Sequence, residues 1–148
     1  LSVNIIQGSV EKMPFPDHHF DFIVSESVLS FVNKPSALKD IYRVLKNGGR
    51  LMAIEQTITQ SLKEKAVNEI KQFYGFPSLT KEEEWVALIK EAGFEEIRIE
   101  KSISIKSATN FNYSGKIEPD LYEILEKHYD ITFKYQEILG YRIYLCTK

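Results

Sequence analysis

The 148-residue sequence predicts one α/β domain with a mostly parallel sheet. A short apolar run bounded by turn residues, FDFIVS at residues 20–25, is typical of a buried parallel strand. A helical pattern and a second apolar run, RLMAIEQ at residues 50–56, come next, and this strand–helix–strand order predicts a right-handed parallel crossover. A final run, YRIYLCT at residues 141–147, predicts an antiparallel last strand.

The first third of the chain predicts a strand and a helix around the 20–25 run. Residues 3–7 have the character of a short strand end, and Gly8 breaks it. Pro35 suits a first helical position. One apolar face then repeats at helical spacing, through Leu38, Ile41, Tyr42 and Leu45. We expect Asn47-Gly48-Gly49 to stop this helix, because a left-handed residue is needed there.

Two sequence patterns in which Ser or Thr precedes Glu by three residues predict further helix starts, as capping boxes. The two pairs are Ser61 with Glu64, for a helix to about residue 74, and Thr80 with Glu83, for a helix that Gly93 closes. Apolar residues at helical spacing follow each pair, so both segments are expected to pack against a core.

The last third predicts a strand over residues 96–105, a polar loop over residues 107–115 and a helix that Pro119 opens. Residues 130–139 are ambiguous, because Ile131, Phe133 and Tyr135 alternate as in a strand while the residues after them favour helix. We interpret this segment as a continuing or broken helix that Gly140 stops.

Composition excludes several classes of protein. With 19 basic and 21 acidic residues the net charge is −2, so no nucleic-acid partner is expected. A single cysteine, Cys146, excludes a disulfide framework and argues against a cysteine zinc site. No apolar run reaches the roughly 18 residues of a membrane span, so we expect no membrane partner and a cytoplasmic location. Because the chain begins at Leu1, a fragment or processed product is also an expectation.

Four segments in this order resemble class I S-adenosylmethionine-dependent methyltransferases, closest to the small-molecule type. They are GSVEKMPF from Gly8, FDFIV from Phe20, RVLKNGG from Arg43 and EEWVALIKEAGFEEIRIEK from Glu83. The resemblance implies a Rossmann-like sheet with an antiparallel last strand. It also implies S-adenosylmethionine as cofactor and a small molecule as methyl acceptor.

On this resemblance, residues 1–148 correspond to one partial domain, strands 3 to 7 of the family fold. The family's glycine-rich cofactor loop follows strand 1, and an acidic residue after strand 2 holds the ribose. Neither is found in this chain, whose only paired glycines, Gly48-Gly49, are assigned to the helix stop. We therefore expect the methyltransferase domain to be truncated at its N-terminus, and the chain alone to bind cofactor weakly or not at all.

The carboxyl ends of the predicted strands give the candidate cofactor residues, since open α/β sheets bind ligands there. At residues 7–11 the candidates are Ser9, Val10 and Glu11. The resemblance places Ser9 where the family has an Asp that accepts from the adenine amino group, and Val10 where a backbone N–H meets the ring. A neutral serine accepts more weakly than a carboxylate. The alternative is that Ser9 is a plain turn residue.

The second set of candidates lies at residues 25–29. The resemblance places the Ser25 backbone at the cofactor's ammonium group and Leu29 either against the cofactor or in the core. Glu26 is the candidate catalytic residue, as an electrostatic partner of the sulfonium or as a general base. The alternative is that Glu26 is an exposed loop carboxylate.

Other chemically distinctive residues have simpler interpretations. The adjacent His18-His19 pair lacks metal-ligand spacing, so no metal site is expected. His128 is interpreted as a surface or packing residue. Five aromatic residues are candidates for a substrate pocket, with core packing favoured for Phe73: Phe73, Tyr74, Phe76, Phe111 and Tyr113. Cys146 is interpreted as an inert packed thiol.

An alternative to catalysis is a non-catalytic oligomerisation module. If strands 1 and 2 are missing, the 20–25 strand is left with a bare edge. A long apolar edge invites pairing with another chain. This hypothesis predicts a homodimer through the exposed sheet edge.

Overall fold

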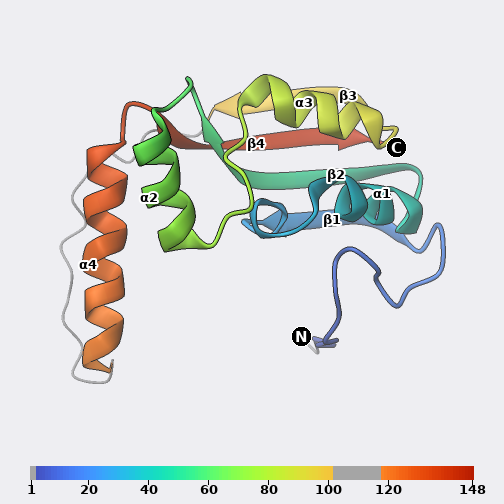
Figure 1. Cartoon of the computed structure of the whole chain (residues 1–148). Coiled ribbons are helices and arrows are strands. Elements are labelled where there is room, and N and C mark those ends of the chain that lie inside the picture. Colours follow the sequence, from blue (N-terminus) through green and yellow to red (C-terminus); the bar gives the residue numbers. More distant parts are fainter. Residues whose placement is uncertain (1–2, 102–117) are drawn as a thin grey trace.

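The computed structural model describes residues 3–101 and 118–148, except for the side chains of residues 101 and 119. Within these residues, four strands form one sheet: β1 (Phe20–Glu26), β2 (Leu45–Ile58), β3 (Glu95–Lys101) and β4 (Leu139–Thr147). Four α-helices and one short 3-10 helix accompany them: α1 (Lys34–Val44), α2 (Glu64–Tyr74), α3 (Glu82–Glu91), α4 (Pro119–Lys134) and η1 (Leu29–Phe31). Figure 1 shows α1 and α3 along the sheet, with α2 and α4 beyond the carboxyl ends of β1 and β2.

The sheet order is β1-β2-β4-β3. β1 and β2 are parallel, with Val24 opposite Met52. β4 is antiparallel to both of its neighbours, placing Leu145 opposite Met52 and Tyr144 opposite Ile99. The predicted α/β class and antiparallel last strand are therefore confirmed, in a mixed sheet of four strands.

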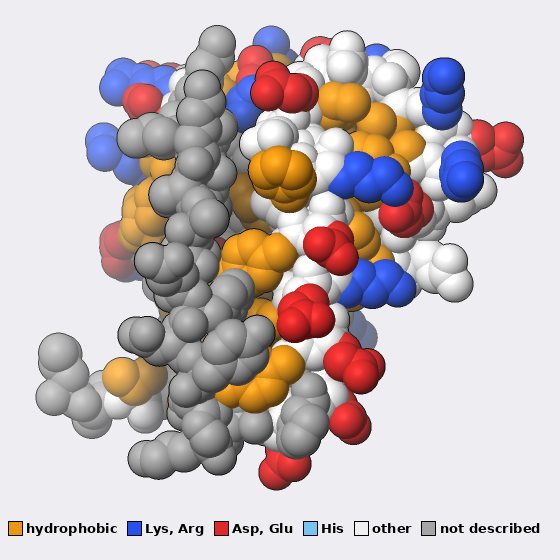
Figure 2. Space-filling model, turned by 90° about the vertical axis from the view of Figure 1, so that its left-hand side faces the viewer, with side chains coloured by type: hydrophobic (Ala, Val, Ile, Leu, Met, Phe, Trp, Pro, Cys, Tyr) orange, Lys and Arg blue, Asp and Glu red, His pale blue; other side chains and the backbone are white. Residues whose placement is uncertain are grey.

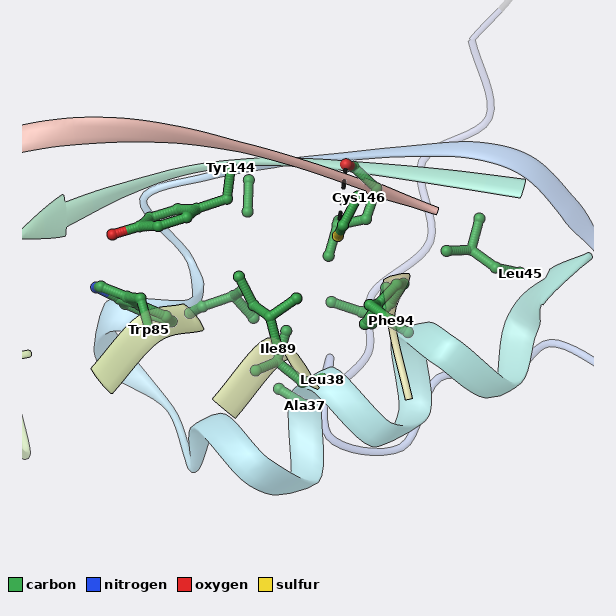
Figure 3. Packing of buried hydrophobic residues seen from close by; sticks show 12 residues of the cluster. Ala37, Leu38, Leu45, Trp85, Ile89, Phe94, Tyr144 and Cys146 are labelled. Carbon is green, nitrogen blue, oxygen red and sulfur yellow. Dashed lines mark hydrogen bonds between the residues drawn. The ribbon is translucent and has the colours of Figure 1, made fainter. Parts of the chain in front are cut away.

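The main core lies between the sheet and helices α1 and α3. Figure 3 shows Leu38 of α1 and Ile89 of α3 pointing toward Tyr144 and Cys146 of β4. The Trp85 and Tyr144 rings lie 5.9 Å apart, and the indole N–H of Trp85 donates to the Gln56 carbonyl at 3.0 Å. Trp85 and Tyr144 thus bury large apolar surfaces, while the indole N–H of Trp85 and the hydroxyl of Tyr144 each keep a hydrogen-bond partner.

The predicted strand at residues 3–7 is wrong. The structure has no strand there, and the Ile5 side chain is 93% exposed. A strand needs a neighbour for its backbone N–H and C=O groups. β1 pairs only with β2 in the described part of the chain, so no strand receives residues 3–7.

The glycine pair belongs to β2 rather than to the helix stop, so that prediction is also wrong. α1 ends at Val44, and β2 begins at once with Leu45. Gly48 has φ 75°, and the β1–β2 register shifts between Phe20 and Phe22 beside it. The glycine therefore supplies a left-handed residue in an irregular strand start.

Neither predicted capping box forms. α2 begins at Glu64 after Lys63, which makes no side-chain cap. At α3 the pattern is displaced by one residue, because the Glu84 carboxylate accepts from the Lys81 N–H at 2.7 Å. The predicted helix end at about residue 74 is confirmed, because α2 ends at Tyr74 and Gly75 follows with a left-handed backbone.

The C-terminal elements largely follow the prediction. α4 continues to Lys134, as the continuing-helix interpretation requires. The predicted helix stop at Gly140 is wrong, because β4 begins at Leu139 and Gly140 lies inside this strand. β3 covers the first part of the predicted strand. Ile103, Ile105 and the loop at residues 107–115 lie outside the described residues.

One edge of the sheet is formed by β1, as the oligomerisation hypothesis assumed. Phe22 and Val24 of this strand are 50% and 53% exposed. The described helices include none long and apolar enough to cross a membrane.

Candidate active site

The carboxyl ends of β1 and β2 lie side by side and form the framework of the candidate site (Figure 1). Glu26, the last residue of β1, is paired with Ile54 of β2. Ser27 then takes a positive φ of 55° and donates its N–H to the Ile54 carbonyl at 2.8 Å. A non-glycine residue in this region is uncommon and is held by its surroundings. The chain therefore turns sharply at the point where β1 leaves the sheet.

The loop after β1 is held by a buried carboxylate, Glu55 of β2, whose side chain is fully buried. Its Oε1 accepts from the Ser25 hydroxyl at 3.2 Å and from the Leu29 N–H at 3.0 Å. Its Oε2 accepts from the Ser30 N–H at 3.0 Å and from the Ser30 hydroxyl at 2.7 Å. Four donors thus satisfy one buried acid, and one side chain joins β1, β2 and η1.

The electrostatic setting of Glu55 includes a buried lysine. Burial raises the pKa of the Glu55 carboxyl, while the hydrogen bonds from Ser30, Leu29 and Ser25 oppose that rise. Lys34, at the start of α1, is only 5% exposed, and burial lowers its pKa while the charges of Glu55 and Glu84 oppose that fall. The Lys34 ammonium donates to the Ser78 hydroxyl at 3.0 Å and lies 5.5 Å from the Trp85 ring centre.

Sequence reasoning missed both Glu55 and Lys34. A signal for Glu55 was present, because it continues the inward alternation of Leu51 and Ala53 along β2. An acid at a position that should be apolar indicates a buried, hydrogen-bonded role. Lys34 gave no such signal, since a lysine before a proline at a helix start is normally exposed.

The predicted adenine-side residues form a tight turn. The Ser9 hydroxyl accepts from the Glu11 N–H at 3.2 Å, and Lys12 N–H donates to the Ser9 carbonyl at 3.2 Å. The Glu11 carboxylate accepts from the Asn33 N–H at 3.0 Å, which joins this turn to the start of α1. Val10 is half-buried against the main core. The turn residues predicted from the sequence thus lie beside the β1–α1 connection.

The three candidates after β1 differ in exposure. Ser25 is buried, and its hydroxyl is directed at Glu55. Glu26 is exposed at the end of the strand. Leu29 is fully buried in the core, so its side chain takes the core position that was one of its two expected roles. Glu26 is therefore the acid at this end of β1 that faces solvent.

A groove of about 1600 Å³ lies between α2 and α4 and includes Phe31 of η1 in its wall. Phe73 and Tyr74 line it and also pack against a second small core around Ile70 and Ile131. Phe111 and Tyr113, two other predicted pocket residues, lie outside the described residues. The groove therefore begins at the same loop that Glu55 holds.

The remaining distinctive residues have structural partners. His19 packs against Phe15 and Phe20, at ring-centre distances of 5.5 and 4.6 Å. In residues 3–101 and 118–148 no cluster of three or more His, Cys, Asp or Glu side chains is placed to hold a metal ion. Cys146 is buried, and burial raises the pKa of its thiol to about 12. The burial of Cys146 agrees with its interpretation as a packed thiol.

Comparison with known proteins relates this fold and sequence to methyltransferases. Residues 1–53 match the family described as a methyltransferase domain. YodH of Bacillus subtilis, described as an uncharacterized methyltransferase, is 32% identical over 152 residues, covering 100% of this chain and 65% of that protein. Over its whole length the chain is therefore similar in sequence to methyltransferases.

Two further likenesses show how much of each relative the chain covers. A ubiquinone/menaquinone biosynthesis C-methyltransferase, UbiE of Psychromonas ingrahamii, is 38% identical over 81 residues, covering 54% of the chain and 31% of UbiE. Phosphoethanolamine N-methyltransferase 2 of Haemonchus contortus, solved with S-adenosyl-L-methionine, superposes with a TM-score of 0.76 at 16% identity, covering 95% of the chain and 36% of that protein. The chain thus spans less than two thirds of each relative, and the structural likeness establishes the fold.

Proposed function

We propose that the protein transfers the methyl group of S-adenosylmethionine to a small-molecule acceptor, with the cofactor along the carboxyl ends of β1 and β2. The observation that carries this proposal is the Glu55 network, which holds the loop from Ser25 to Ser30 at the edge where open α/β sheets bind ligands. The match to the methyltransferase domain family and the cofactor in the Haemonchus contortus complex support the choice of cofactor.

Within the chain, the proposed cofactor residues are Ser9, Val10 and Glu11 on the adenine side, with Ser25 and Leu29 at the methionine side. The polar groups of these residues fit the role of binding the cofactor. The Ser9 oxygen already accepts one N–H, yet a hydroxyl oxygen has a second lone pair for an amino group. Ser25 and Leu29 would act through their backbone, because both side chains are buried.

We assign Glu26 the role of an electrostatic partner. When bound, the cofactor supplies a methyl group already activated by a positive sulfonium. An exposed carboxylate at the end of β1 favours that positive charge. Methyl transfer gains mainly from proximity and alignment, which are worth about 7–11 kcal/mol in favourable cases. Glu26→Gln is therefore expected to weaken cofactor binding while the fold is kept.

We also propose that the 148 residues hold only part of the cofactor site, since they contain no glycine-rich loop of the family type. Calorimetric titration with S-adenosylhomocysteine tests this. The chain alone is expected to bind weakly, and a protein extended at its amino end is expected to bind in the micromolar range. Micromolar binding by the chain alone would overturn the partial-site proposal and leave the cofactor assignment intact.

A second candidate function rests on the exposed β1 edge. Phe22 and Val24 are half-exposed on an edge strand, and unpaired strand edges promote association. Sedimentation equilibrium measures the oligomeric state and so distinguishes the oligomerisation module from the methyl-transfer function. A stable dimer that Val24→Lys converts to monomer would favour the oligomerisation module, whereas a monomeric chain would exclude it.

A further inference from the structure

A small cavity lies beside the Glu55 network, between η1, the end of β2 and the segment that joins α2 to α3. Its volume is about 10 Å³, and its polar lining residues are Ser30, Gln56, Ser78 and Thr80. A water molecule needs roughly 10–15 Å³ of such space. The cavity therefore matches one water molecule at the lower limit of size and excludes any larger ligand.

Gln56 of β2 brings an unpartnered polar atom to this cavity. The residue is 7% exposed, and its side-chain oxygen Oε1 has no hydrogen-bond partner within the described part of the chain. Leaving a buried amide oxygen unpaired is costly, and buried polar atoms are nearly always paired with protein or with ordered water. The cavity therefore needs a ligand that donates a hydrogen bond.

Two serines that line the cavity also contact buried charges. The Ser30 hydroxyl donates to Glu55 Oε2 at 2.7 Å, so the serine oxygen keeps a lone pair for a further donor. The hydroxyl oxygen of Ser78, an exposed residue, accepts from the buried Lys34 ammonium at 3.0 Å, so its own O–H is able to donate. The lining therefore offers one further acceptor and one donor besides the Gln56 oxygen.

The charges near the cavity favour a neutral ligand. A cation here would lie near the Lys34 ammonium, and an anion would lie near the Glu55 carboxylate and the Gln56 oxygen. Charges of the same sign repel each other more strongly in a buried site than in water. Water meets the requirements of size, charge and hydrogen bonding together.

We propose that this cavity binds one water molecule, which donates to Gln56 Oε1 and to the Ser30 oxygen and accepts from the Ser78 hydroxyl. About three partners are usual for a buried water. A chain of hydrogen bonds then runs from the Lys34 ammonium to the Glu55 carboxylate, with every donor directed toward the acid. The water thus ties the segment before α3 to the loop after β1. This inference does not depend on the methyl-transfer proposal.

The direct test is a crystal structure of the 148-residue chain at a resolution that shows ordered water. A density peak is expected at hydrogen-bond distance from Gln56 Oε1 and within reach of the Ser30 and Ser78 oxygens. Gln56→Met keeps an unbranched side chain of similar length but removes the oxygen, and its structure is expected to lack this peak. A Gln56 oxygen with no water beside it, or one that contacts a protein donor instead, would overturn the inference.

Nuclear magnetic resonance tests the same water in solution, through cross-relaxation between water and the methyl groups of Ile58, which lines the cavity. The signal is expected in the unmodified chain and is expected to be lost in Gln56→Met. Gln72→Met is the matched control and is expected to keep the signal. Gln72 is an exposed residue in the groove between α2 and α4, and Figure 2 shows acidic and basic side chains at this end of the molecule.

Two results in solution would also overturn the inference: no signal at Ile58 in the unmodified chain, or a signal that Gln56→Met leaves unchanged. Circular dichroism shows whether each variant has kept its fold. If Gln56→Met does not fold, the density in the unmodified chain decides the question alone. Every sample lacks S-adenosylhomocysteine, so a failure here leaves the methyl-transfer proposal standing, and failure of that ligand to bind leaves the water site standing.

Discussion

Glu55 and Ser30 are joined by two hydrogen bonds, from the serine N–H at 3.0 Å and from its hydroxyl at 2.7 Å, both to Oε2 of the carboxylate. The two residues are 25 positions apart and lie on β2 and η1. A buried acid with this many donors is costly to disturb, since each donor left unpaired loses its hydrogen bond in a water-free site. The link therefore sets the position of the loop that follows β1.

The first prediction concerns the stability of this network. Glu55→Gln keeps the shape but replaces one oxygen by an NH₂ group, which faces either the Leu29 or the Ser30 N–H and accepts from neither. The free energy of unfolding in urea is expected to fall by about 1–3 kcal/mol. Glu26→Gln is the matched control at an exposed acid, and is expected to change stability by no more than about 0.5 kcal/mol. Equal effects would contradict the assigned role of Glu55.

The second prediction follows from the raised pKa of Glu55. A carboxyl that holds its proton more tightly in the folded state stabilises the fold most below its unfolded pKa, and this contribution is lost as pH rises through the folded pKa. The stability difference between the unmodified chain and Glu55→Gln is therefore expected to grow as pH falls from neutral toward about 4.5. Protonated Glu55 still accepts from backbone N–H groups, whereas the amide nitrogen does not. A difference that shrinks on acidification would show that the pKa is lowered instead.

The third prediction concerns Cys146. Burial raises its thiol pKa to about 12, so very little thiolate forms at neutral pH, and access is also blocked. Iodoacetamide is expected to leave the folded chain unmodified while adding one group to the chain in urea, as read by intact mass. Because the sequence has a single cysteine, the reading is unambiguous. Rapid labelling of the folded chain would mean that β4 opens readily from the sheet.

The fourth prediction concerns Gly93 at the end of α3. Its φ is 105°, and a Cβ there would lie 3.0 Å from two carbons of the Tyr42 ring. Gly93→Ala is expected to lower the free energy of unfolding by at least about 1–2 kcal/mol, through backbone strain and crowding. Gly8→Ala is the matched control, because the nearest atom to its added Cβ is a Pro14 carbon at ordinary contact distance, 3.4 Å. Thermal unfolding compares the two variants. Similar decreases in melting temperature for Gly93→Ala and Gly8→Ala would argue against backbone strain at Gly93.

Much of the fold could be predicted because its signals are local. The spacing of Leu38 and Ile41 in α1 specifies a buried face directly. The apolar run at residues 20–25 predicts the strand β1 correctly, but its predicted burial is wrong, because β1 lies at the sheet edge with Phe22 and Val24 half-exposed. The errors lie where a residue's role depends on a partner. Residues 3–7 have strand character but no neighbour, and Gly48-Gly49 lie at an irregular β1–β2 pairing rather than at a helix end.

In the candidate site, too, residues with local sequence signals could be predicted, and residues whose role depends on a distant partner could not. Glu26 and the turn after β1 could be placed from the sequence, because they follow the carboxyl end of a predicted parallel strand. Ser9 was assigned by the same argument, but no strand precedes it. Glu55 is distant in sequence from Ser25 and Ser30, and its four donors come together only through parallel pairing of β1 with β2. The hydrogen bond between Tyr74 and His128 joins α2 to α4 across 54 residues, and no sequence spacing indicates such a contact.

The most direct test of the central claim is a titration of isotope-labelled chain with S-adenosylhomocysteine, followed by the backbone amide spectrum. The account predicts weak binding, with shifts concentrated at Ser9, Val10 and Glu11 and in the loop from Ser25 to Leu29. Amides near His18, at the opposite ends of the strands, are expected to stay unchanged. Shifts confined to that opposite end, or no shifts at the highest ligand concentration, would contradict a cofactor site at the carboxyl ends of β1 and β2.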